Sequence, residues 1–333
     1  MAILWCGGED IDFPVGAGPL TVSSSTGVRA GWSRCTLINN NSAPTSIQQS
    51  LPFPGGAVTS AWLHSRVFFY GASVSAGRTT AGVTLAGTTK GLFVGVDAAT
   101  IGKAALVTLN GTTRVQLAVE SGTSFVVNTS SRIDLRILNY GATATVEVYV
   151  NQVLVISYSG DVTVSGMTAF DTVSFGSGYG ISSVHVSEFI VSDTDTRTIQ
   201  GLVTGALTSN GTTNAWTNPT YTNINAAAVT DATPTYTPTP GQDNQYNITD
   251  MPAGAYAVLA RKITMRAAAG PATATGIKMG YNSGGSIGFG AGASKAPGGA
   301  YGTHEQLDAV NPVTGLAWTQ AEQNALQLNF RSE

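Results

Sequence analysis

The residues of this chain that could perform catalytic chemistry are few and scattered. The candidates for a pair of catalytic carboxyl groups are Glu9, Asp10 and Asp12 near the start of the chain, and Asp193 with Asp195. A retaining glycosidase needs two carboxyl groups about 5 Å apart, which on one strand requires acidic residues at i and i+2 or i+4. Neither group is expected in a strand that faces a cleft. Both are interpreted as exposed turn carboxylates, so no catalytic residue is assigned and the protein is predicted not to be an enzyme.

The same carboxylates are also the candidates for a metal site. Glu9, Asp10 and Asp12 offer the hard oxygen ligands that calcium prefers, although the DxDxDG spacing of a calcium loop is absent. Calcium at these three residues is therefore the one cofactor kept open, and otherwise no cofactor is predicted. The pair at 193 and 195 is the second, weaker alternative for the same ion.

Histidines and cysteines give no recognisable site. His64, His185 and His304 lie in no nucleophile motif such as G-x-S-x-G. Cys6 and Cys35 show no short metal-ligand spacing, either with each other or with the histidines, so zinc is not expected. The two cysteines could form a disulfide, within the chain or across chains. Two thiols in a chain without an export signal are more often free, and the apolar run that ends at Cys6 lacks the features of a signal peptide.

Aromatic side chains provide the remaining candidates, because sugar-binding surfaces combine an aromatic face with a few polar groups. Tyr149, Tyr158 and Tyr179 could form such a glycan-binding platform. Tyr149 is also suited to cross-strand packing, which is the favoured interpretation. The GSGYG stretch around Tyr179 lacks the Lys-Ser/Thr of a phosphate-binding loop and is interpreted as a turn.

The pattern that predicts the strands on which these residues lie is most evident between residues 131 and 158. Apolar and polar residues alternate from 132 to 137 and from 145 to 150, with a turn at Tyr140 and Gly141 between them. This period of two predicts a hairpin with one apolar face. Asn151 and Gln152 separate it from a third strand at the spacing of a tight turn, although Gln adopts positive φ less readily than Gly and the loop could be one residue longer. An apolar face needs a second sheet to cover it, so a β-sandwich is predicted.

Further short strands are expected on both sides of this hairpin. They are predicted at residues 3–5, 20–22, 28–32, 36–38, 61–70, 91–97, 104–110, 114–120, 124–128, 173–175 and 183–191. The run Ala61 to Tyr70 is expected to be buried on both faces because it is apolar nearly throughout. Regular short strands are typical of a sandwich or jelly roll. The polar DTDTR stretch then ends this first domain, which is predicted to span residues 1–197.

Residues 198–333 are predicted to form a smaller β-rich domain. A strand is expected at 255–266 with 276–281 as its partner. The Gly-rich stretch 280–302 is expected to be a long mobile loop or to take a conformation set by its neighbours in an assembly. Thr319 and Glu322 have the spacing of a capping box and predict a short C-terminal helix. The predicted fold class is therefore all-β, with a sandwich followed by a β-rich domain.

Composition excludes some classes of partner. Only 11% of the residues are charged, against roughly 25% in an average soluble protein, and 40 of the 333 residues are Gly. Such surfaces are common in large assemblies and in extracellular β-proteins. The net charge of −3 offers no basic stripe, so no nucleic-acid partner is expected. No apolar run reaches the roughly 18 residues needed to span a bilayer, so no membrane partner is expected either.

Four motifs give the chain a resemblance to a known family. They are the N-terminal LWCGGEDIDF, the hairpin VEVYVN, the exit SEFIVSDTDTR and the terminal NPVTGLAWTQAEQNALQ. Together they resemble a family of tailed-bacteriophage virion proteins, which carry an N-terminal concanavalin-like (laminin-G-like) jelly roll followed by a smaller β-rich domain. The resemblance covers nearly the whole chain. It implies a structural component of the particle, such as a tail, fibre or head appendage.

The predicted function is therefore a non-enzymatic phage virion structural protein. Its expected location is the virion, assembled in the host cytoplasm, and its expected partners are other virion proteins and further copies of itself, with a trimer implied by the resemblance. The alternative is a lectin-like receptor-binding adhesin that recognises host surface glycans. A depolymerase that uses Asp10 and Asp12 is a third hypothesis.

Overall fold

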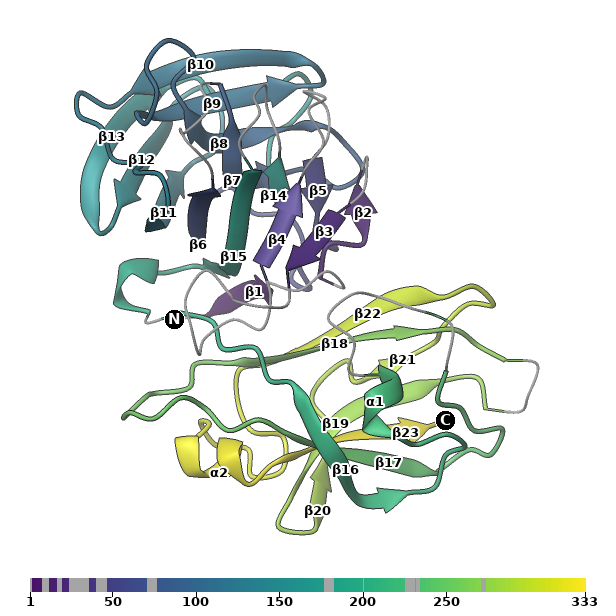
Figure 1. Cartoon of the computed structure of the whole chain (residues 1–333). Helices are drawn as coiled ribbons and strands as arrows, with labels where there is room; N and C mark the ends of the chain where they lie inside the picture. Colours follow the sequence, from purple (N-terminus) through teal and green to yellow (C-terminus); the bar gives the residue numbers. More distant parts are fainter. Residues whose placement is uncertain are drawn as a thin grey trace. The chain divides into compact units, whose positions relative to one another are not determined.

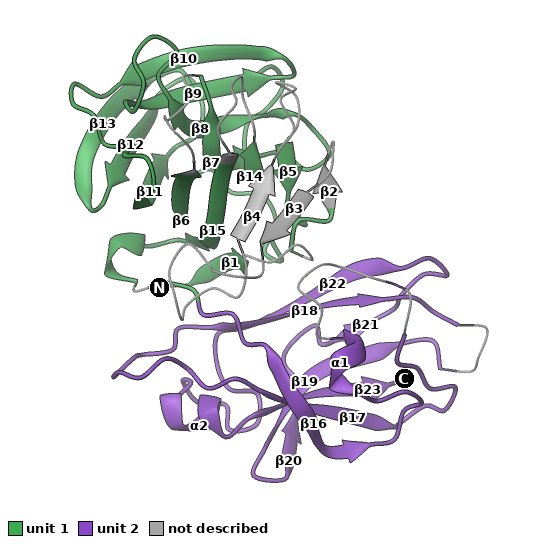
Figure 2. Ribbon diagram, in the orientation of Figure 1, with its two compact units in different colours: residues 1–202 green, residues 203–333 purple. Residues whose placement is uncertain are grey.

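The structure is a computed structural model in which the chain forms two compact units, residues 1–202 and residues 203–333 (Figures 1 and 2). It describes residues 2–7, 12–16, 20–23, 36–39, 47–70, 77–176, 183–199, 201–224, 231, 234–270 and 274–333. Among these residues no helix is long and apolar enough to cross a membrane.

Unit 1 is a sandwich of two antiparallel sheets. The eight-stranded sheet has the order β13-β12-β11-β6-β15-β4-β3, with β1 paired to β15. Its strands are β1 (Ile3–Gly7), β3 (Leu20–Ser23), β4 (Thr36–Asn39), β6 (Ala61–Tyr70), β11 (Ser130–Leu138), β12 (Ala144–Val150), β13 (Val153–Gly160) and β15 (Ser183–Ser192). The seven-stranded sheet has the order β10-β9-β8-β7-β14-β5-β2. Its strands are β2 (Val15–Gly16), β5 (Ile47–Gln49), β7 (Thr79–Thr84), β8 (Lys90–Val96), β9 (Ala104–Asn110), β10 (Thr113–Val119) and β14 (Thr172–Gly176).

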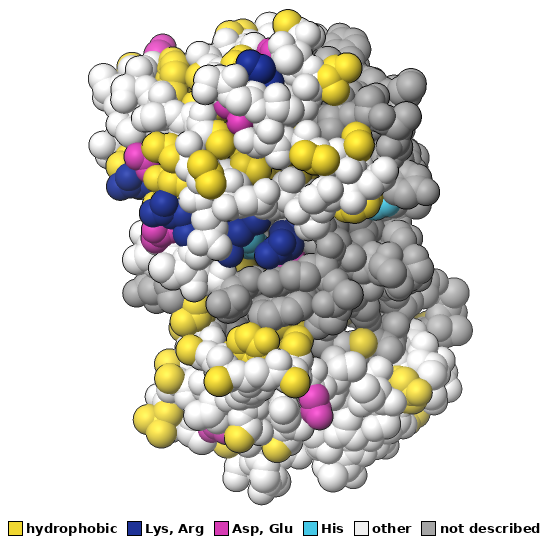
Figure 3. Space-filling model, turned by 60° about the vertical axis from the view of Figure 1, so that its left-hand side comes forward, with side chains coloured by type: hydrophobic (Ala, Val, Ile, Leu, Met, Phe, Trp, Pro, Cys, Tyr) yellow, Lys and Arg dark blue, Asp and Glu magenta, His cyan; other side chains and the backbone are white. Residues whose placement is uncertain are grey.

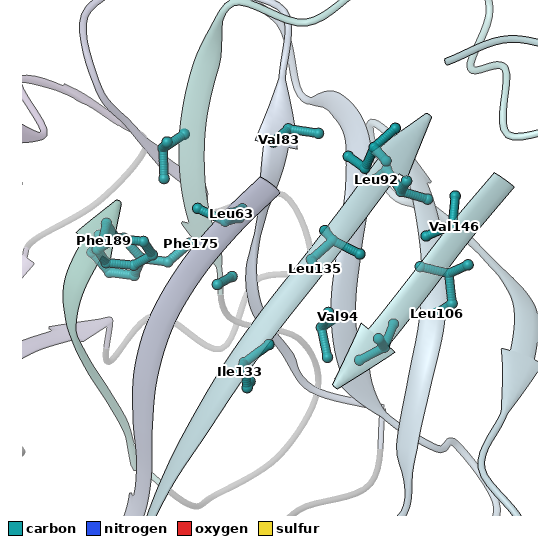
Figure 4. Packing of buried hydrophobic residues seen from close by; sticks show 14 of the residues in the cluster. Leu63, Val83, Leu92, Val94, Leu106, Ile133, Leu135, Val146, Phe175 and Phe189 are labelled. Atoms are coloured by element: carbon teal, nitrogen blue, oxygen red, sulfur yellow. The ribbon is translucent and has the colours of Figure 1, made fainter. Parts of the chain in front are cut away.

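The core of unit 1 lies between the two sheets, where alternate residues of the central strands point inward (Figure 4). The eight-stranded sheet contributes Leu63, Ile133, Leu135 and Val146, and the seven-stranded sheet contributes Val83, Leu92, Val94 and Leu106. None of these side chains is more than 2% exposed. Fully burying one such side chain contributes about 1.5–3 kcal/mol, so this interlocked layer stabilises the sandwich. The predicted fold class is confirmed: the chain is nearly all β, with a jelly-roll-like sandwich and a short C-terminal helix.

The hairpin and third strand predicted around residue 151 are present in register. Ile137 pairs with Val146 across β11 and β12, and Val150 pairs with Val153 across the following turn. Asn151 and Gln152 have φ values of 50° and 70°, the conformation of a two-residue primed turn. The longer loop is therefore not formed, and Gln152 holds the left-handed conformation without being Gly.

Two other strand predictions for unit 1 need comment. The strand expected at 124–128 is wrong, because these residues form a loop in which Phe125 enters the core with 2% of its surface exposed. Asn128 has a φ of 55°, which an extended strand cannot continue through. The strand expected at 28–32 lies outside the described residues.

Unit 2 contains a six-stranded antiparallel sheet and a two-stranded ribbon. The sheet has the order β16-β17-β23-β19-β20, with β21 paired to β19. Its strands are β16 (Leu207–Asn214), β17 (Asp243–Ile248), β19 (Ile277–Ser283), β20 (Ser286–Gly288), β21 (Ser294–Lys295) and β23 (Gln327–Ser332). The ribbon consists of β18 (Arg261–Ala267) and β22 (Gly302–Asp308). The described part of the unit also contains two short helices, α1 (Tyr221–Ile224) and α2 (Gln320–Asn324).

The second half of the chain departs from its predicted pairing. The strand expected at 255–266 begins only at Arg261, and its partner is β22 rather than β19, which pairs instead with β23. The Gly-rich stretch 280–302 carries β20 and β21 and is not a featureless loop. Its glycines allow close packing, since a Cβ on Gly280 would lie 2.4 Å from the carbonyl oxygen of Gly288. The predicted capping box is confirmed: Thr319 caps α2 and exchanges hydrogen bonds with Glu322.

Candidate functional site

The outer face of the eight-stranded sheet carries a patch of charged and aromatic side chains. Strand alternation places them opposite the core residues of the same strands. The register aligns Glu147, Arg136 and Trp62 in one row across β12, β11 and β6, and Tyr149, Asp134 and His64 in the next row. In a chain with 11% charged residues this is an unusual concentration of ionisable groups.

The exposed part of the patch is built on two stacked rings. Trp62 and Tyr149 lie with ring centroids 5.8 Å apart and planes 29° apart. The guanidinium of Arg197 lies 4.1 Å from the Tyr149 centroid and 5.2 Å from that of Trp62, and Arg136 lies 5.5 Å from Trp62. We call these four side chains, Trp62, Arg136, Tyr149 and Arg197, the platform. Cation–π contacts of this kind hold a guanidinium flat against the ring.

Glu147 joins the two halves of the platform. Its Oε2 accepts hydrogen bonds from the Tyr149 hydroxyl at 2.8 Å and from Arg136 Nη1 at 3.0 Å. Burial would raise the pKa of Glu147, but these two hydrogen bonds outweigh it and the pKa is lowered. The pKa of Tyr149 is raised, first by burial and then by Glu147. At neutral pH Glu147 is therefore an ionised carboxylate, and it accepts a hydrogen bond from the protonated hydroxyl of Tyr149.

The platform arginine at 197 comes from the segment that leaves β15 and crosses the outer face of the sheet. A 3-10 turn, η2 (Thr196–Thr198), forms there. Arg132 donates to the carbonyl oxygens of Thr196 and Ile199 at 2.6 and 2.9 Å, and the Thr196 hydroxyl donates to Asp134 at 2.8 Å. These bonds attach residues 196–199 to the sheet, which fixes the position of Arg197.

Beneath this segment lies a fully buried ionic network. Asp134 Oδ1 lies 3.0 Å from His64 Nδ1, Asp134 Oδ2 accepts from Arg132 Nε at 2.7 Å, and neither His64 nor Asp134 exposes any surface. Burial would raise the pKa of Asp134, but hydrogen bonds from His64 and Arg132 hold it well below its usual range. Burial lowers the pKa of His64, although Asp134 opposes this effect. The network therefore consists of the neutral imidazole of His64, the carboxylate of Asp134 and the guanidinium of Arg132.

A second buried carboxylate lies beside the network on β15. Glu188 sits in a bulge where the register with β6 shifts, with a φ of 56° and no exposed surface. Its Oε2 lies 3.5 Å from Arg66 Nε. A non-glycine residue in this conformation stores strain, and such strain concentrates where a side chain must be aimed at a particular point. Here the bulge directs the carboxylate to the same outer face.

The three tyrosines expected to bind glycan do not share one surface. Tyr149 is part of the platform and is 7% exposed. Tyr158 pairs with Val146, whose side chain lies in the core, and packs against the core itself, with its hydroxyl donating to the Asp161 carbonyl oxygen. Tyr179 lies outside the described residues. The stack of its ring on Trp62 agrees with the packing interpretation of Tyr149, and its role in glycan binding stays a prediction.

The predicted metal and disulfide residues are only partly described. Glu9 and Asp10 lie outside the described residues, and Asp12 is buried with 4% of its surface exposed. Across the described ranges no group of three or more His, Cys, Asp or Glu side chains could hold a metal ion. Cys6 is buried, whereas Cys35 lies outside the described residues, so their disulfide stays a prediction.

Sequence reasoning missed most residues of the patch. Trp62 and His64 lie in an apolar strand that was expected to be buried on both faces, and burial there is indeed nearly complete. The signal that could have found them is the i, i+2, i+4 series Arg132, Asp134 and Arg136, three charges on one strand face. Such a row on one face of a charge-poor protein indicates either an exposed charged patch or a covered network, and the structure has the covered network at Arg132 and Asp134 and an exposed guanidinium at Arg136.

Comparisons with known proteins give matches at the level of structure. No family model matches the chain, and no curated protein matches it in sequence. A carbohydrate-binding module from Bacillus subtilis is 13% identical, with 52% of this chain and 97% of that chain covered and a TM-score of 0.34. An endo-β-1,4-glucuronan lyase from the fungus Trichoderma reesei is 10% identical, covering 58% and 96%, with a TM-score of 0.41. An alginate lyase from Chlorella virus is 10% identical, covering 52% and 89%, with a TM-score of 0.36.

These matches correct the predicted function. The proteins just named are polysaccharide lyases and a carbohydrate-binding module, and no phage structural protein is among them. The prediction of a non-enzymatic virion structural protein is therefore wrong, and so is the prediction that the protein is not an enzyme. The sandwich part of the family resemblance is confirmed, whereas nothing here shows a phage origin. The lectin-like alternative agrees better with the matches.

Proposed function

We propose that unit 1 is a carbohydrate-binding module whose platform recognises an acidic glycan. The observation that carries the proposal is the pair of guanidiniums of Arg136 and Arg197, whose side chains are 34% and 33% exposed while the rings beneath them are almost completely buried. Two cations are thus fixed at the surface, Arg136 on strand β11 and Arg197 on the segment that is hydrogen-bonded to the sheet. Fixing a donor before the ligand arrives reduces the entropy lost on binding.

The chemistry of the two arginines fits the carboxylate of a uronate. Arg197 uses Nε and Nη2 on Asp195, and Arg136 uses Nη1 on Glu147. The remaining terminal nitrogen of each guanidinium has no hydrogen bond to the described residues. A guanidinium presents a planar set of donors that matches a carboxylate, and charge-assisted bonds of this kind are about twice as strong as neutral ones.

Carboxylates beside the arginines fit the hydroxyl groups of the same glycan. Asp195 and Glu147 keep side-chain exposures of 34% and 18%, so their oxygens can accept from sugar hydroxyls. Cations and anions are interspersed here, and Lys and Arg side chains gather in one band of Figure 3 with Asp and Glu beside them. Recognition then depends on short contacts rather than on a long-range field, so binding should be only moderately sensitive to salt.

The test measures binding of uronate oligosaccharides by isothermal calorimetry. Oligomers of alginate and glucuronan, the polymers after which two of the similar lyases are named, are the first ligands, with carboxyl-reduced oligomers as the neutral comparison. Arg197→Gln should weaken binding about 10- to 100-fold, because one charge-assisted bond contributes roughly 1.5–3 kcal/mol. The affinity of Arg197→Lys should lie between that of Arg197→Gln and that of the wild type, because lysine keeps the positive charge but cannot stack as a planar group.

The matched control is Lys103→Gln, which removes one positive charge from unit 1 next to β9 of the other sheet. It should bind like the wild type. Equal loss in both variants would show that only total charge matters, and equal affinity for the carboxyl-reduced oligomers would contradict recognition of an acid. A screen of purified bacterial surface polysaccharides then tests the finer hypothesis that the glycan belongs to a host cell.

Cleavage of such a glycan by elimination is a second candidate, because the platform holds the Tyr149 phenol beneath the Arg197 guanidinium and beside the Glu147 carboxylate. Glu147 would take the proton from the carbon beside the uronate carboxylate, and the guanidiniums would stabilise the charge that develops on that carboxylate. The C–O bond would then break as the Tyr149 phenol, kept protonated by its raised pKa, protonates the leaving oxygen. Glu147, with its lowered pKa, is a weak proton acceptor, and for this reason binding is placed before cleavage. Ultraviolet absorbance from an unsaturated uronate product, lost in Tyr149→Phe, would establish it.

A further inference from the structure

The sheet of unit 2 has a polar face opposite the core of the unit. Strand β23 lies between β17 and β19 (Figure 1), and alternate residues of the three strands enter the core. The register places the remaining residues in two rows on the polar face: Asp243, Arg331 and Lys278 in the first row, and Gln245, Asn329 and Gly280 in the second.

The ring of Phe289 lies on this face, against Gly280. A Cβ on Gly280 would lie 2.6 Å from the Phe289 ring, so glycine leaves the room that the ring occupies on the sheet. Lys278 Nζ and the Arg331 guanidinium lie 5.9 and 5.0 Å from the ring centroid. We call these three side chains, Lys278, Phe289 and Arg331, the unit 2 cluster. Like the platform of unit 1, it combines two cations with an aromatic surface.

The guanidinium of Arg331 is held in one orientation by Asp243. Arg331 Nε and Nη2 donate to the two carboxylate oxygens at 2.9 and 2.7 Å, which makes a bidentate pair. Two buried amides orient the acid in turn: Asn329 Nδ2 donates to Asp243 Oδ1 at 2.9 Å, and Gln245 Nε2 donates to Asn329 Oδ1 at 2.9 Å. Asn329 and Gln245 are 0% and 1% exposed. A buried chain of hydrogen bonds thus fixes a cation that lies at the surface.

Both cations keep donors for a ligand. The side chains of Arg331 and Lys278 are 35% and 38% exposed. Arg331 Nη1 has no hydrogen bond to the described residues, and Lys278 Nζ, 2.6 Å from Glu333 Oε1, uses one of its three N–H groups there. A carboxylate fits these neighbouring donors, because it has two oxygens that accept charge-assisted hydrogen bonds.

Phe289 provides an apolar surface beside these donors. Its ring is half-buried, and it also lines a cavity of about 350 Å³. Free space therefore borders the ring. Ligand sites combine such an aromatic wall with a few fixed polar groups, and the C–H face of a sugar ring packs on an aromatic side chain.

We propose that the unit 2 cluster is a second binding site for an acidic glycan, in which a uronate carboxylate accepts from Arg331 and Lys278 and the sugar ring packs on Phe289. The choice of ligand rests on the proposed function of unit 1, whereas the geometry of the cluster is independent of the platform. One chain then offers two sites to a polymer, and linked sites bind a polymer more tightly than either site alone.

The experiment titrates the full chain with short oligomers of alginate and glucuronan, and isothermal calorimetry gives the number of oligomers bound per chain. The wild type should bind two, and carboxyl-reduced oligomers should not bind. Arg331→Gln should weaken the unit 2 site about 10- to 100-fold, because a charge-assisted hydrogen bond is lost. Arg331→Lys should retain part of the affinity, since it keeps the charge, and Phe289→Ala should weaken the same site by removing the apolar surface.

The matched control is Arg266→Gln in the same unit. Arg266 also forms a bidentate pair with an aspartate, Asp231, and lies 5.7 Å from the ring centroid of Tyr301. Its side chain is 30% exposed, close to the value for Arg331. The substitution removes the same charge and the same kind of ion pair, and it should bind like the wild type. Equal loss in both variants would show that only the charge of unit 2 matters, and would overturn the proposal.

A platform variant separates this proposal from the function proposed for unit 1. Arg197→Gln should leave one oligomer bound per chain, and the chain with both Arg197→Gln and Arg331→Gln should bind none. A wild type that binds one oligomer, lost in Arg331→Gln and kept in Arg197→Gln, would support the unit 2 site and contradict the platform. Unchanged binding in Arg331→Gln, or no binding by the wild type, would overturn the unit 2 site.

Discussion

At the scale of the residue, burial on the outer face decides how the ionisable groups behave. His64 and Asp134 point away from the core and would be titratable surface groups if the sheet were bare. Residues 196–199 cover them, and both side chains are completely buried. The pKa of each group is then lowered, that of Asp134 by its hydrogen bonds and that of His64 by the burial itself.

This burial predicts a pH dependence of stability. Because the pKa of His64 is lower in the folded state than its ordinary value of 6.5, the stabilisation is present above that value and is lost as the pH falls below it. The melting temperature should therefore be lower at about pH 5 than at about pH 7.5. His64→Gln, whose amide can still donate to Asp134, should show a smaller difference between the two pH values in calorimetry.

Some dependence will remain in that variant, because burial also lowers the pKa values of His185 and His304. An unchanged difference would show that His64 does not titrate in this range. A further loss of stability below about pH 4 is expected from Asp134, whose lowered pKa stabilises the fold only while the carboxylate is ionised.

At the scale of the element, the residue types in the turns account for the hairpins, but they do not determine which strands pair with each other. The turn between β12 and β13 forms with Gln152 in the left-handed region, at a φ of 70°, because the register of three strands requires it. Asn151 suits the same turn and accepts a hydrogen bond from the Arg132 backbone N–H at 2.9 Å. The tertiary pairing thus imposes a conformation that Gln152 adopts at some cost.

Gln152→Gly should therefore stabilise the protein. Glycine adopts positive φ without steric penalty, and after its greater loss of backbone entropy a net gain of about 0.5–1 kcal/mol in the free energy of unfolding is expected. Urea denaturation measures it. Gln152→Ala is the matched control, since it removes the same side chain but keeps the Cβ, and it should give no gain. A loss of stability in the glycine variant would mean that the strain argument is incorrect.

At the scale of the whole molecule, the end of unit 1 is defined by the segment that covers its sheet. The division between the two units follows Leu202, whereas the sequence-based boundary was placed at residue 197 because DTDTR is polar. Thr196 and Ile199 accept hydrogen bonds from Arg132, so a boundary within this segment would leave buried charges without partners.

A comparison of two truncated chains tests whether the segment that covers the sheet stabilises unit 1. A chain of residues 1–202 should fold, since its core contains only residues of unit 1. A chain of residues 1–195 should be less stable by roughly 3 kcal/mol or more, because two hydrogen bonds to Arg132 and one to Asp134 are lost. Thermal melting followed by circular dichroism measures the difference. Equal melting temperatures would show that the covering segment contributes nothing.

The sequence by itself determined the features that depend on near neighbours. Alternation determined the hairpin of β11 and β12 and its inward face, and the spacing of Thr319 and Glu322 determined the cap of α2, because each pattern reflects forces within a few residues. The all-β class followed from the same signals.

Only the tertiary structure decided which strands pair and which polar groups meet. The pairing of β18 with β22, the stack of Arg197 on Tyr149 and the ion pair of Arg331 with Asp243 all join residues distant in the chain. Such contacts form because covering an apolar face and satisfying buried charges are properties of the whole packed unit. No short window of sequence contains that information, and both proposed binding sites arise from it.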